Sequence, residues 1–259
     1  LVELAKMNPK VVGITPAMAS GCGMTMLAEA MPERFYDVGI EEEHAVTFAA
    51  GLAAGGMKPF CNIYSSFSHR AFDQIFHDVA LQNLPVVLCL DRGGIVGEDG
   101  ATHHGCYDMS VYRTIPGAII AAPKDEIELK DMMYSAMLAE TGPYIIRYPR
   151  GYGEGADWKG HTFTKLETGV GECLLEGSET AVVCAGPFSY RALEAASSLK
   201  AERAWNPSIY NIRYIKPLDI ALIDEICRKH STIVTVEDGT AIGGLHGAVA
   251  EYVTEHHPT

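Results

Sequence analysis

The apolar residues of the first 150 positions form short, nearly continuous runs that alternate with helical patterns. Such runs are typical of strands in a parallel sheet that is covered on both faces. The predicted strands span residues 11–15, 35–38, 60–64, 85–91, 118–122 and 144–148. Helices are predicted between these strands. One short helix ends near residue 30, and three others cover about residues 42–55, 67–82 and 126–140. The alternation predicts a doubly wound, mostly parallel α/β domain over residues 1–155.

Glycine and polar residues dominate positions 149–160, which predicts a linker. The alternation of strands and helices then resumes. Strands are predicted at residues 180–184, 209–212 and 232–236, and helices at about 190–199, 220–229 and after Gly244. This pattern predicts a second, smaller α/β domain over residues 165–259.

Composition and charge narrow the class of partner. The chain has 259 residues, 47% of them hydrophobic, and a formal net charge of -13. An acidic chain lacks the positive surface that nucleic acid or an anionic membrane requires, so we expect neither as a partner. No apolar run is long enough to span a bilayer, and we expect no signal peptide.

The seven cysteines are odd in number, and no two have C-x-x-C spacing. Most lie in apolar runs, which predicts buried free thiols in a reducing compartment, and therefore a cytoplasmic protein. Residues 1–6 have the pattern of a helix interior and include no starting Met. We therefore expect a fragment or a processed subunit.

The most informative stretch is residues 35–55. It predicts a short strand, a turn at Gly39 and a helix that opens with Glu41, Glu42 and Glu43. Acidic residues at a helix start are common, because they favour the positive end of the helix dipole. This helix, however, is small and apolar enough to be buried, and a carboxylate at its buried edge needs a partner or a function.

Further polar clusters follow the other predicted strands, where an open α/β sheet places its ligands. They are residues 63–67 with Arg70, Asp91 with Arg92, the Gly-rich loop 96–105, and residues 147–150. His103 on its own is no stronger a sign of function than any other loop histidine. Its position near Asp99 favours a function. Arginines after strands of an acidic protein predict a phosphorylated, anionic substrate.

Two tempting motifs carry little information. The glycines at residues 21 and 23 lack a third glycine at the dinucleotide spacing, which favours a simple turn. The Glu-Asp-Gly triplets at residues 98–100 and 237–239 have no following Asn to complete an oxygen ligand set for Mg²⁺. We predict no metal site at either triplet.

Several motifs, taken in order, resemble the deoxyxylulose-phosphate synthases, a family of thiamine diphosphate enzymes in the transketolase superfamily. The resemblance covers nearly the whole chain, and the order of the motifs makes it specific. It implies a pyrimidine-binding domain followed by a transketolase C-terminal-like domain. The motifs are at residues 37–51, 58–67, 97–105, 147–151 and 216–219.

The resemblance implies that four residues bind thiamine diphosphate. Glu42 matches the catalytic glutamate that hydrogen-bonds N1′ of the aminopyrimidine ring. Phe67 matches the aromatic residue that stacks on this ring, and Ile40 and Met18 match apolar contacts to the cofactor. The cofactor supplies the electron sink, while the protein positions it.

The resemblance also implies condensation of pyruvate with D-glyceraldehyde 3-phosphate and loss of CO₂. Tyr64, Arg92 and Arg150 match phosphate and substrate contacts, with Arg70 beside them. Asp99 and His103, which are the other implied catalytic and substrate-binding residues, match polar groups around the bound intermediate. The chain departs from the family at Glu41 and Glu43, where Ala and Gln are usual.

Family members also carry a domain with a Gly-Asp-Gly motif that binds Mg²⁺ and the cofactor diphosphate, and this sequence has no such motif. We expect it elsewhere in the polypeptide or on a separate subunit, within a homodimer. Two alternatives stay open: the C-terminal subunit of a split transketolase, and a non-catalytic partner subunit.

Overall fold

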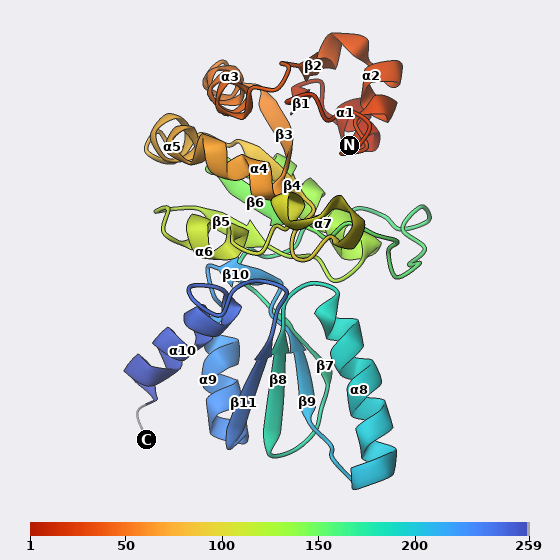
Figure 1. Ribbon diagram of the computed structural model, residues 1–259, viewed down its shortest axis with the longest axis vertical. Coiled ribbons are helices and arrows are strands. Elements are labelled where there is room, and N and C mark those ends of the chain that lie inside the picture. Colours follow the sequence, from red (N-terminus) through yellow and green to blue (C-terminus); the bar gives the residue numbers. More distant parts are fainter. Residues whose placement is uncertain (258–259) are drawn as a thin grey trace.

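Two sheets, each covered by helices, follow one another along the long axis of the molecule (Figure 1). The structure is a computed structural model that describes residues 1–257. The predicted class, two α/β units with mostly parallel sheets, is confirmed.

The first sheet has seven strands in the order β10-β5-β6-β4-β3-β1-β2. All neighbouring pairs are parallel except β10 with β5. Parallel strands place their carboxyl ends, and the loops that follow them, at one edge of the sheet. The strands are β1 (Val11–Thr15), β2 (Phe35–Asp37), β3 (Lys58–Tyr64), β4 (Val87–Asp91), β5 (Ile119–Ala121), β6 (Tyr144–Arg147) and β10 (Tyr214–Lys216).

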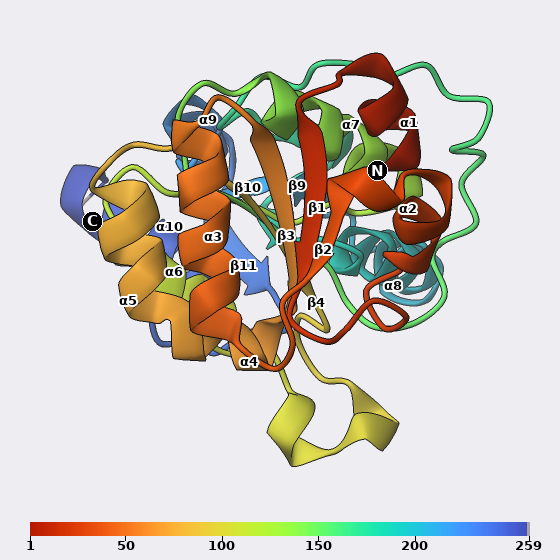
Figure 2. The same ribbon diagram turned by 90° about the horizontal axis from the view of Figure 1, so that it is seen from above.

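Helices cover both faces of this sheet (Figure 2). One face carries α3 (Glu42–Ala54), α4 (Ser65–Ser68), α5 (Phe72–Gln74) and α6 (Asp108–Arg113). The other carries α1 (Val2–Met7), α2 (Thr25–Ala30) and α7 (Glu126–Leu138). The helix predicted at residues 67–82 starts two residues earlier and is not uniform, since a 3-10 turn at His69–Ala71 and a π-helical stretch at Ile75–Ala80 interrupt it. The sequence did not predict α6.

The second sheet has the order β11-β8-β9-β7, with β7 antiparallel to β9. Its strands are β7 (Glu172–Leu175), β8 (Thr180–Cys184), β9 (Ser208–Asn211) and β11 (Thr232–Val236), and its helices are α8 (Phe188–Arg203), α9 (Ile220–Lys229) and α10 (Leu245–His256). The prediction of buried thiols holds for Cys61, Cys89 and Cys184, but Cys173 is exposed, because it lies on the edge strand β7.

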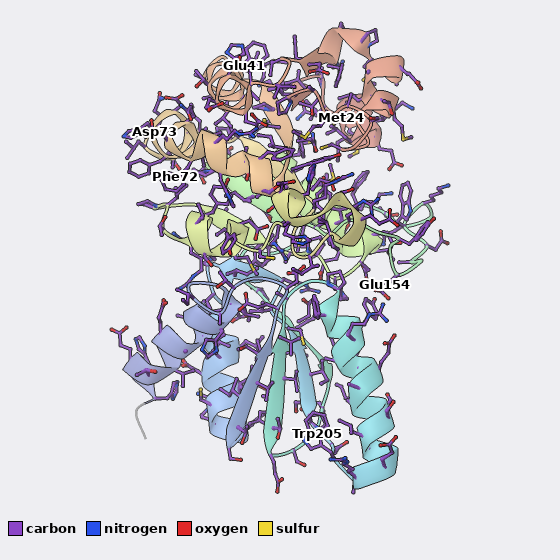
Figure 3. All side chains as sticks on the ribbon, in the orientation of Figure 1. Met24, Glu41, Phe72, Asp73, Glu154 and Trp205 are labelled. Atoms are coloured by element: carbon purple, nitrogen blue, oxygen red, sulfur yellow. The ribbon has the colours of Figure 1, made fainter. Side chains whose placement is uncertain are left out.

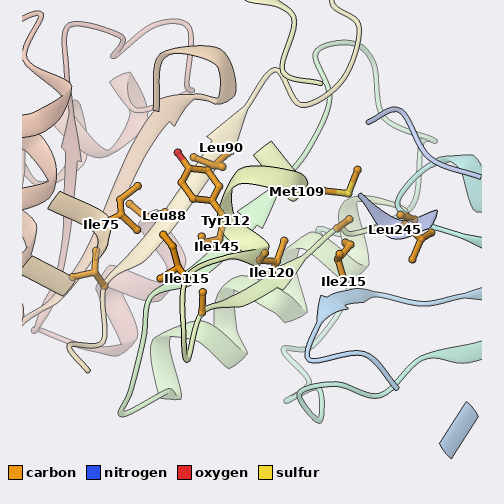
Figure 4. Close-up of a cluster of buried hydrophobic side chains, with 14 of the residues drawn as sticks. Ile75, Leu88, Leu90, Met109, Tyr112, Ile115, Ile120, Ile145, Ile215 and Leu245 are labelled. Atoms are coloured by element: carbon orange, nitrogen blue, oxygen red, sulfur yellow. The ribbon is translucent and has the colours of Figure 1, made fainter. Parts of the chain in front are cut away.

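The two units share a hydrophobic core. Ile215 of β10 and Leu245 of α10 belong to the same cluster of buried residues as Met109 and Ile120 of the first unit (Figure 4). β10, which the sequence did not predict, lies within the second unit's residues but completes the first sheet. Separation of the two units would therefore expose apolar surface on both.

The predicted linker has no helix or strand between residues 148 and 171, and it is fastened to its neighbours. Glu126 of α7 accepts a hydrogen bond from the backbone of Gly155 at 3.0 Å, and Asp131 bonds His161 at 2.9 Å. Glu154 pairs with Arg191 near the start of α8 (Figure 3). These contacts fix the path of the linker over α7 and α8.

A network of charged side chains joins α7 to the second unit. Glu128, 3% exposed, accepts from Arg213 at 2.7 Å and from Lys124 at 3.1 Å. Glu172 of β7 bonds the same two cations. Burial raises the pKa of Glu172, but hydrogen bonds from Lys124 and Asn211 outweigh burial and hold this pKa below its ordinary value. The network thus favours the charged form of the Glu172 carboxylate.

We expect Glu128→Ala to lower the free energy of unfolding by roughly 2–3 kcal/mol, because it removes charge-assisted hydrogen bonds from the half-buried Lys124 and Arg213 and leaves Glu172 to pair with both cations. Urea unfolding measures this loss. Glu140→Ala, which removes an exposed carboxylate just beyond α7, serves as the control and is expected to change stability by about 0.5 kcal/mol or less. Equal losses in both variants would show that the network contributes nothing specific.

Candidate active site

The acidic start of α3 contains one buried carboxylate. Glu42 is 2% exposed, whereas its neighbour Glu41 is exposed. Glu42 Oε1 accepts a hydrogen bond from Arg70 Nη1 at 2.8 Å. The side chain of Arg70 is 54% exposed, so the buried carboxylate of Glu42 is paired with a cation that reaches the surface. The structure therefore separates Glu42 from the ordinary acidic residues of a helix start.

Three aromatic side chains gather next to this pair. Phe67 of α4 stacks on Tyr64, the last residue of β3, with ring centroids 5.7 Å apart. His103 packs edge-on against Phe67 at 5.0 Å and lies 6.2 Å from Tyr64. Arg70 lies over the ring of Phe67 at 5.2 Å. The aromatic group thus connects directly to the Glu42–Arg70 pair.

Arg92 follows β4 and is held on several sides. Its guanidinium lies 3.8 Å from the ring centroid of Tyr64 and donates to Asp91 at 2.8 Å and to the carbonyl oxygen of Gly21 at 3.0 Å. Burial lowers the pKa of Arg92, but Asp91 outweighs burial and raises it above its ordinary value. Its backbone φ of 63° lies in the left-handed region, which is uncommon for a residue with a side chain.

The glycine turn at residues 20–23 has a packing role at this point. A Cβ at Gly21 would overlap the hydroxyl of Tyr64, so only glycine allows the turn to approach that ring. The prediction of a turn is confirmed.

Asp99 connects the two predicted phosphate ligands. Its Oδ2 lies 3.2 Å from Arg92 Nε and 3.2 Å from Arg150 Nε. Arg150 is 38% exposed and also lies 3.7 Å from Glu98. Arg92 is 14% exposed and has further partners, so Arg150 is the more accessible of the two cations.

Asp99 and His103 belong to a segment that projects from the body of the molecule beyond β4, drawn in yellow in Figure 2. It contains two short 3-10 turns, Gly97–Asp99 and Ala101–His103. Backbone hydrogen bonds between Gly94 and Gly105 close its base. His103 of this segment contacts Phe67, so the segment reaches the aromatic group although it lies outside the sheet.

Eight of the ten predicted site residues form one chain of contacts through these pairs. Ile40 and Met18 are not part of it. Ile40 is 76% exposed in the loop before α3, and Met18 is half-buried in the turn after β1. Arg147, which the sequence groups with the strand-end arginines, is buried elsewhere between Asp108 and Asp238.

Sequence reasoning also missed the direct pairing of Arg70 with Glu42. The signal was weak, because the two residues lie on different elements and 28 positions apart.

The first residue of α3 and side chains near it offer groups that suit a flat heteroaromatic ring. The Glu42 carboxylate can accept or share a proton, the half-buried ring of Phe67 offers a face for stacking, and the exposed side chain of Ile40 offers an apolar contact. Within residues 1–257, no three His, Cys, Asp or Glu side chains are arranged to hold a metal ion. The Glu-Asp-Gly triplets instead pair with arginines or, at Glu237, accept backbone N–H groups at the start of α10.

Comparison with known proteins identifies the family of this chain. Residues 1–154 match the model of the transketolase pyrimidine-binding domain, and residues 169–259 match that of the transketolase C-terminal domain. The chain belongs to the transketolase family. This confirms the family resemblance of the sequence motifs.

Curated relatives in this family carry the name 1-deoxy-D-xylulose-5-phosphate synthase. The protein of Bacteroides thetaiotaomicron is 51% identical over 259 residues, and that of Dictyoglomus turgidum is 50% identical over 253 residues. Alignment covers 100% and 98% of this transketolase-family chain, but only 40% of each relative. The chain thus spans about two fifths of the relatives' length.

Solved transketolases have the same fold. One structure, described as a split gene transketolase in an inactive beta4 tetramer, is 32% identical with a TM-score of 0.87, and the match covers 99% of this chain and 83% of that one. The transketolase from Leishmania mexicana is 20% identical with a TM-score of 0.75, over 93% of this chain and 37% of that one, and supports the fold alone.

None of the helices within residues 1–257 combines the length and apolar character that a membrane-spanning segment requires.

We expect Arg92→Ala to destabilise the protein by about 2–3 kcal/mol, because it removes hydrogen bonds from a charged group to Asp91 and Gly21 and the contact with Tyr64. Arg150→Ala, the control, removes a more exposed ion pair and is expected to cost about 0–1 kcal/mol. Urea unfolding compares the two variants. A larger loss for Arg150→Ala would contradict the assignment of Arg92 as the anchored cation.

Proposed function

We propose that this chain is part of a 1-deoxy-D-xylulose-5-phosphate synthase. The whole enzyme would condense pyruvate with D-glyceraldehyde 3-phosphate, release CO₂ and give 1-deoxy-D-xylulose 5-phosphate. The chain of contacts from Glu42 to Arg150 carries the proposal, because it gathers proton-transfer, stacking and phosphate-binding groups at one sheet edge. The identity of about half to relatives with this name supports it.

Thiamine diphosphate would supply a nucleophilic carbon and an electron sink for the electrons that CO₂ leaves behind. The role of the chain is to bind and orient the aminopyrimidine. In the proposal, Glu42 hydrogen-bonds N1′ and holds or releases the proton at that atom, while Phe67 stacks on the ring. Ile40 and Met18 supply apolar contacts. The buried position of Glu42, which Arg70 connects to the half-buried ring of Phe67, fits these roles.

The arginines would bind the phosphate of the acceptor. A guanidinium pairs with phosphate through charge-assisted and often bidentate hydrogen bonds. Arg150 is the accessible cation and would exchange part of its contact with Asp99 for phosphate, while Arg92 stays anchored beside Tyr64. Phosphate binding would thus replace one charged partner of Arg150 by another.

Three further groups would act near the reacting atoms. His103 and Asp99 lie on the projecting segment and would hydrogen-bond the hydroxyl and carbonyl groups of the substrates. Arg70 lies between Glu42 and Phe67, where it orients the carboxylate and can bind the pyruvate carboxylate. His103 and Arg70 lie against the ring of Phe67, and Asp99 pairs with Arg92, which lies over the ring of Tyr64, so a substrate at these rings would be within their reach.

The rest of the cofactor site would lie outside this chain. We propose that Mg²⁺ and the diphosphate bind a separate domain or subunit, because relatives are more than twice as long as the aligned region. Residues 1–155 would form the pyrimidine-binding domain and residues 165–259 the C-terminal domain. The complete enzyme would act as a cytoplasmic homodimer.

A split transketolase is the second candidate. It is favoured by the 32% identical structure, of which this chain covers 83%. The two activities differ in donor, since the synthase decarboxylates pyruvate while a transketolase transfers two-carbon units between sugar phosphates. Release of CO₂ from carboxyl-labelled pyruvate by the complete protein, dependent on D-glyceraldehyde 3-phosphate, would support the synthase. Two-carbon transfer without such release would replace it.

We expect Glu42→Gln in the complete enzyme to lower kcat by about 10²-fold to 10⁴-fold, because the amide keeps the size of the side chain but cannot exchange the proton. Steady-state turnover with saturating cofactor measures this effect. Glu41→Gln removes an exposed neighbouring charge and is expected to change kcat by less than about threefold. A large loss in Glu41→Gln with normal turnover in Glu42→Gln would move the role to Glu41.

We expect Arg150→Ala to raise KM for D-glyceraldehyde 3-phosphate by about 10-fold to 100-fold, because a charge-assisted contact to phosphate is worth about 1.5–3 kcal/mol. KM for pyruvate is expected to change by less than about threefold. Arg191→Ala, which removes an arginine that binds Glu154 and Glu194 instead, is the control. Equal increases for both substrates would argue against phosphate binding by Arg150.

A further inference from the structure

Arg147 connects three segments that lie far apart in the sequence. It is the last residue of β6 and is 2% exposed. Its Nε donates to Asp108 Oδ2 at 2.9 Å, and its Nη1 donates to Asp238 Oδ1 at 2.7 Å. Asp108 begins α6, whereas Asp238 follows β11 in the second unit. The Asp108–Arg147–Asp238 cluster therefore crosses the boundary between the units.

The cluster depends on both carboxylates. The third guanidinium nitrogen of Arg147, Nη2, is buried and has no hydrogen-bond partner among the described residues. Burial lowers the pKa of Arg147, but Asp108 and Asp238 outweigh burial and raise it above its ordinary value. A buried cation with two carboxylate partners holds its neighbours in one arrangement, because separation would leave a charge unpaired.

The base of the projecting segment rests on this cluster. A Cβ at Gly93 would lie 2.7 Å from Arg147 Nη2, and a Cβ at Gly94 would overlap the Asp238 carboxylate. Gly94 and Gly105 exchange backbone hydrogen bonds of 2.9 and 2.8 Å across the base. A shift of Asp238 or Arg147 would thus move both ends of residues 93–105.

The cluster also contacts the start of α4. Asp108 Oδ2, which accepts from Arg147, also accepts from Ser65 Oγ at 3.0 Å. Ser65 is the first residue of α4, which carries Phe67, and its hydroxyl also bonds the carbonyl oxygen of Gly105 at 3.4 Å. The Asp108 carboxylate is therefore connected through Ser65 both to the helix that carries Phe67 and to Gly105 at the base of the projecting segment.

We propose that Asp238 is a positioning residue. From the second unit it fixes, through Arg147 and Asp108, the base of the segment that carries Asp99 and His103 and the start of α4. Its effect on catalysis rests on the proposed function, whereas the mechanical coupling does not. The second unit thereby takes part in the geometry of a site whose predicted residues all lie in the first.

Hydrogen–deuterium exchange on the complete protein tests the coupling. We expect Asp238→Asn to speed exchange in residues 93–107 by about tenfold, because Arg147, against which the base of the segment packs, loses a charged partner. Asp224→Asn is the matched control: Asp224 lies in the second unit and bonds Tyr252 and His257, both at 2.8 Å. This control is expected to leave residues 93–107 unchanged. Exchange that is the same in both variants would overturn the proposal.

Kinetics separate positioning from loss of folded protein. We expect Asp238→Asn to raise KM for D-glyceraldehyde 3-phosphate by about tenfold and KM for pyruvate by less than about twofold, because the segment that carries Asp99 is displaced. A smaller folded fraction would lower kcat and leave both KM values unchanged, and that result would overturn the positioning role.

Two further arms keep the test decisive. If Asp238→Asn does not fold, Asp108→Asn removes the other charged partner of Arg147 and is expected to speed exchange in the same segment; unchanged exchange would overturn the proposal. If the wild-type enzyme does not consume pyruvate, the proposed function fails, and the exchange experiment alone then decides the coupling.

Discussion

Pairing of poorly hydrated charges is the constraint on which this structure depends. An ion that leaves water loses several kcal/mol of solvation unless a partner of opposite charge replaces it. Glu42 meets this need with Arg70, Arg92 with Asp91 and Asp99, and Arg147 with two carboxylates. Apart from Arg92 and Asp91, which are neighbours in the sequence, these pairs join different segments. The Glu42–Arg70 and Arg92–Asp99 pairs therefore satisfy the charges and also assemble the candidate active site.

The pairs also determine how a ligand can enter. An anionic substrate gains little from a cation that keeps its own carboxylate, and it gains more where the carboxylate can yield its place. Arg150 combines partial exposure with ion pairs to Glu98 and Asp99 of the projecting segment, whereas Arg92 is enclosed by Tyr64 and Gly21. In this arrangement Arg150 can exchange its carboxylate partner for a substrate, whereas Arg92 supports the structure.

The fold was predictable where the signal was local. Continuous apolar runs predicted most strands of the first sheet, and the apolar pattern after Gly39 predicted α3. The polar residues that follow the predicted strands include most members of the chain of contacts from Glu42 to Arg150. β7 and β10 were missed because each is short and is defined by pairing with a strand distant in sequence. The sequence placed Arg147 in the polar cluster at residues 147–150 but could not show that it is buried, because its partner Asp238 lies 91 positions away. Ile40 and Met18 remain predictions, since their expected partner is the cofactor.

The central claim is that Glu42 meets the aminopyrimidine of thiamine diphosphate. A crystal structure of the complete enzyme with thiamine diphosphate and Mg²⁺ tests it most directly. The account predicts N1′ within about 2.6–3.0 Å of a Glu42 carboxylate oxygen, with the ring against Phe67. A pyrimidine ring bound away from Glu42, or held instead by Glu41 or Glu43, would contradict it.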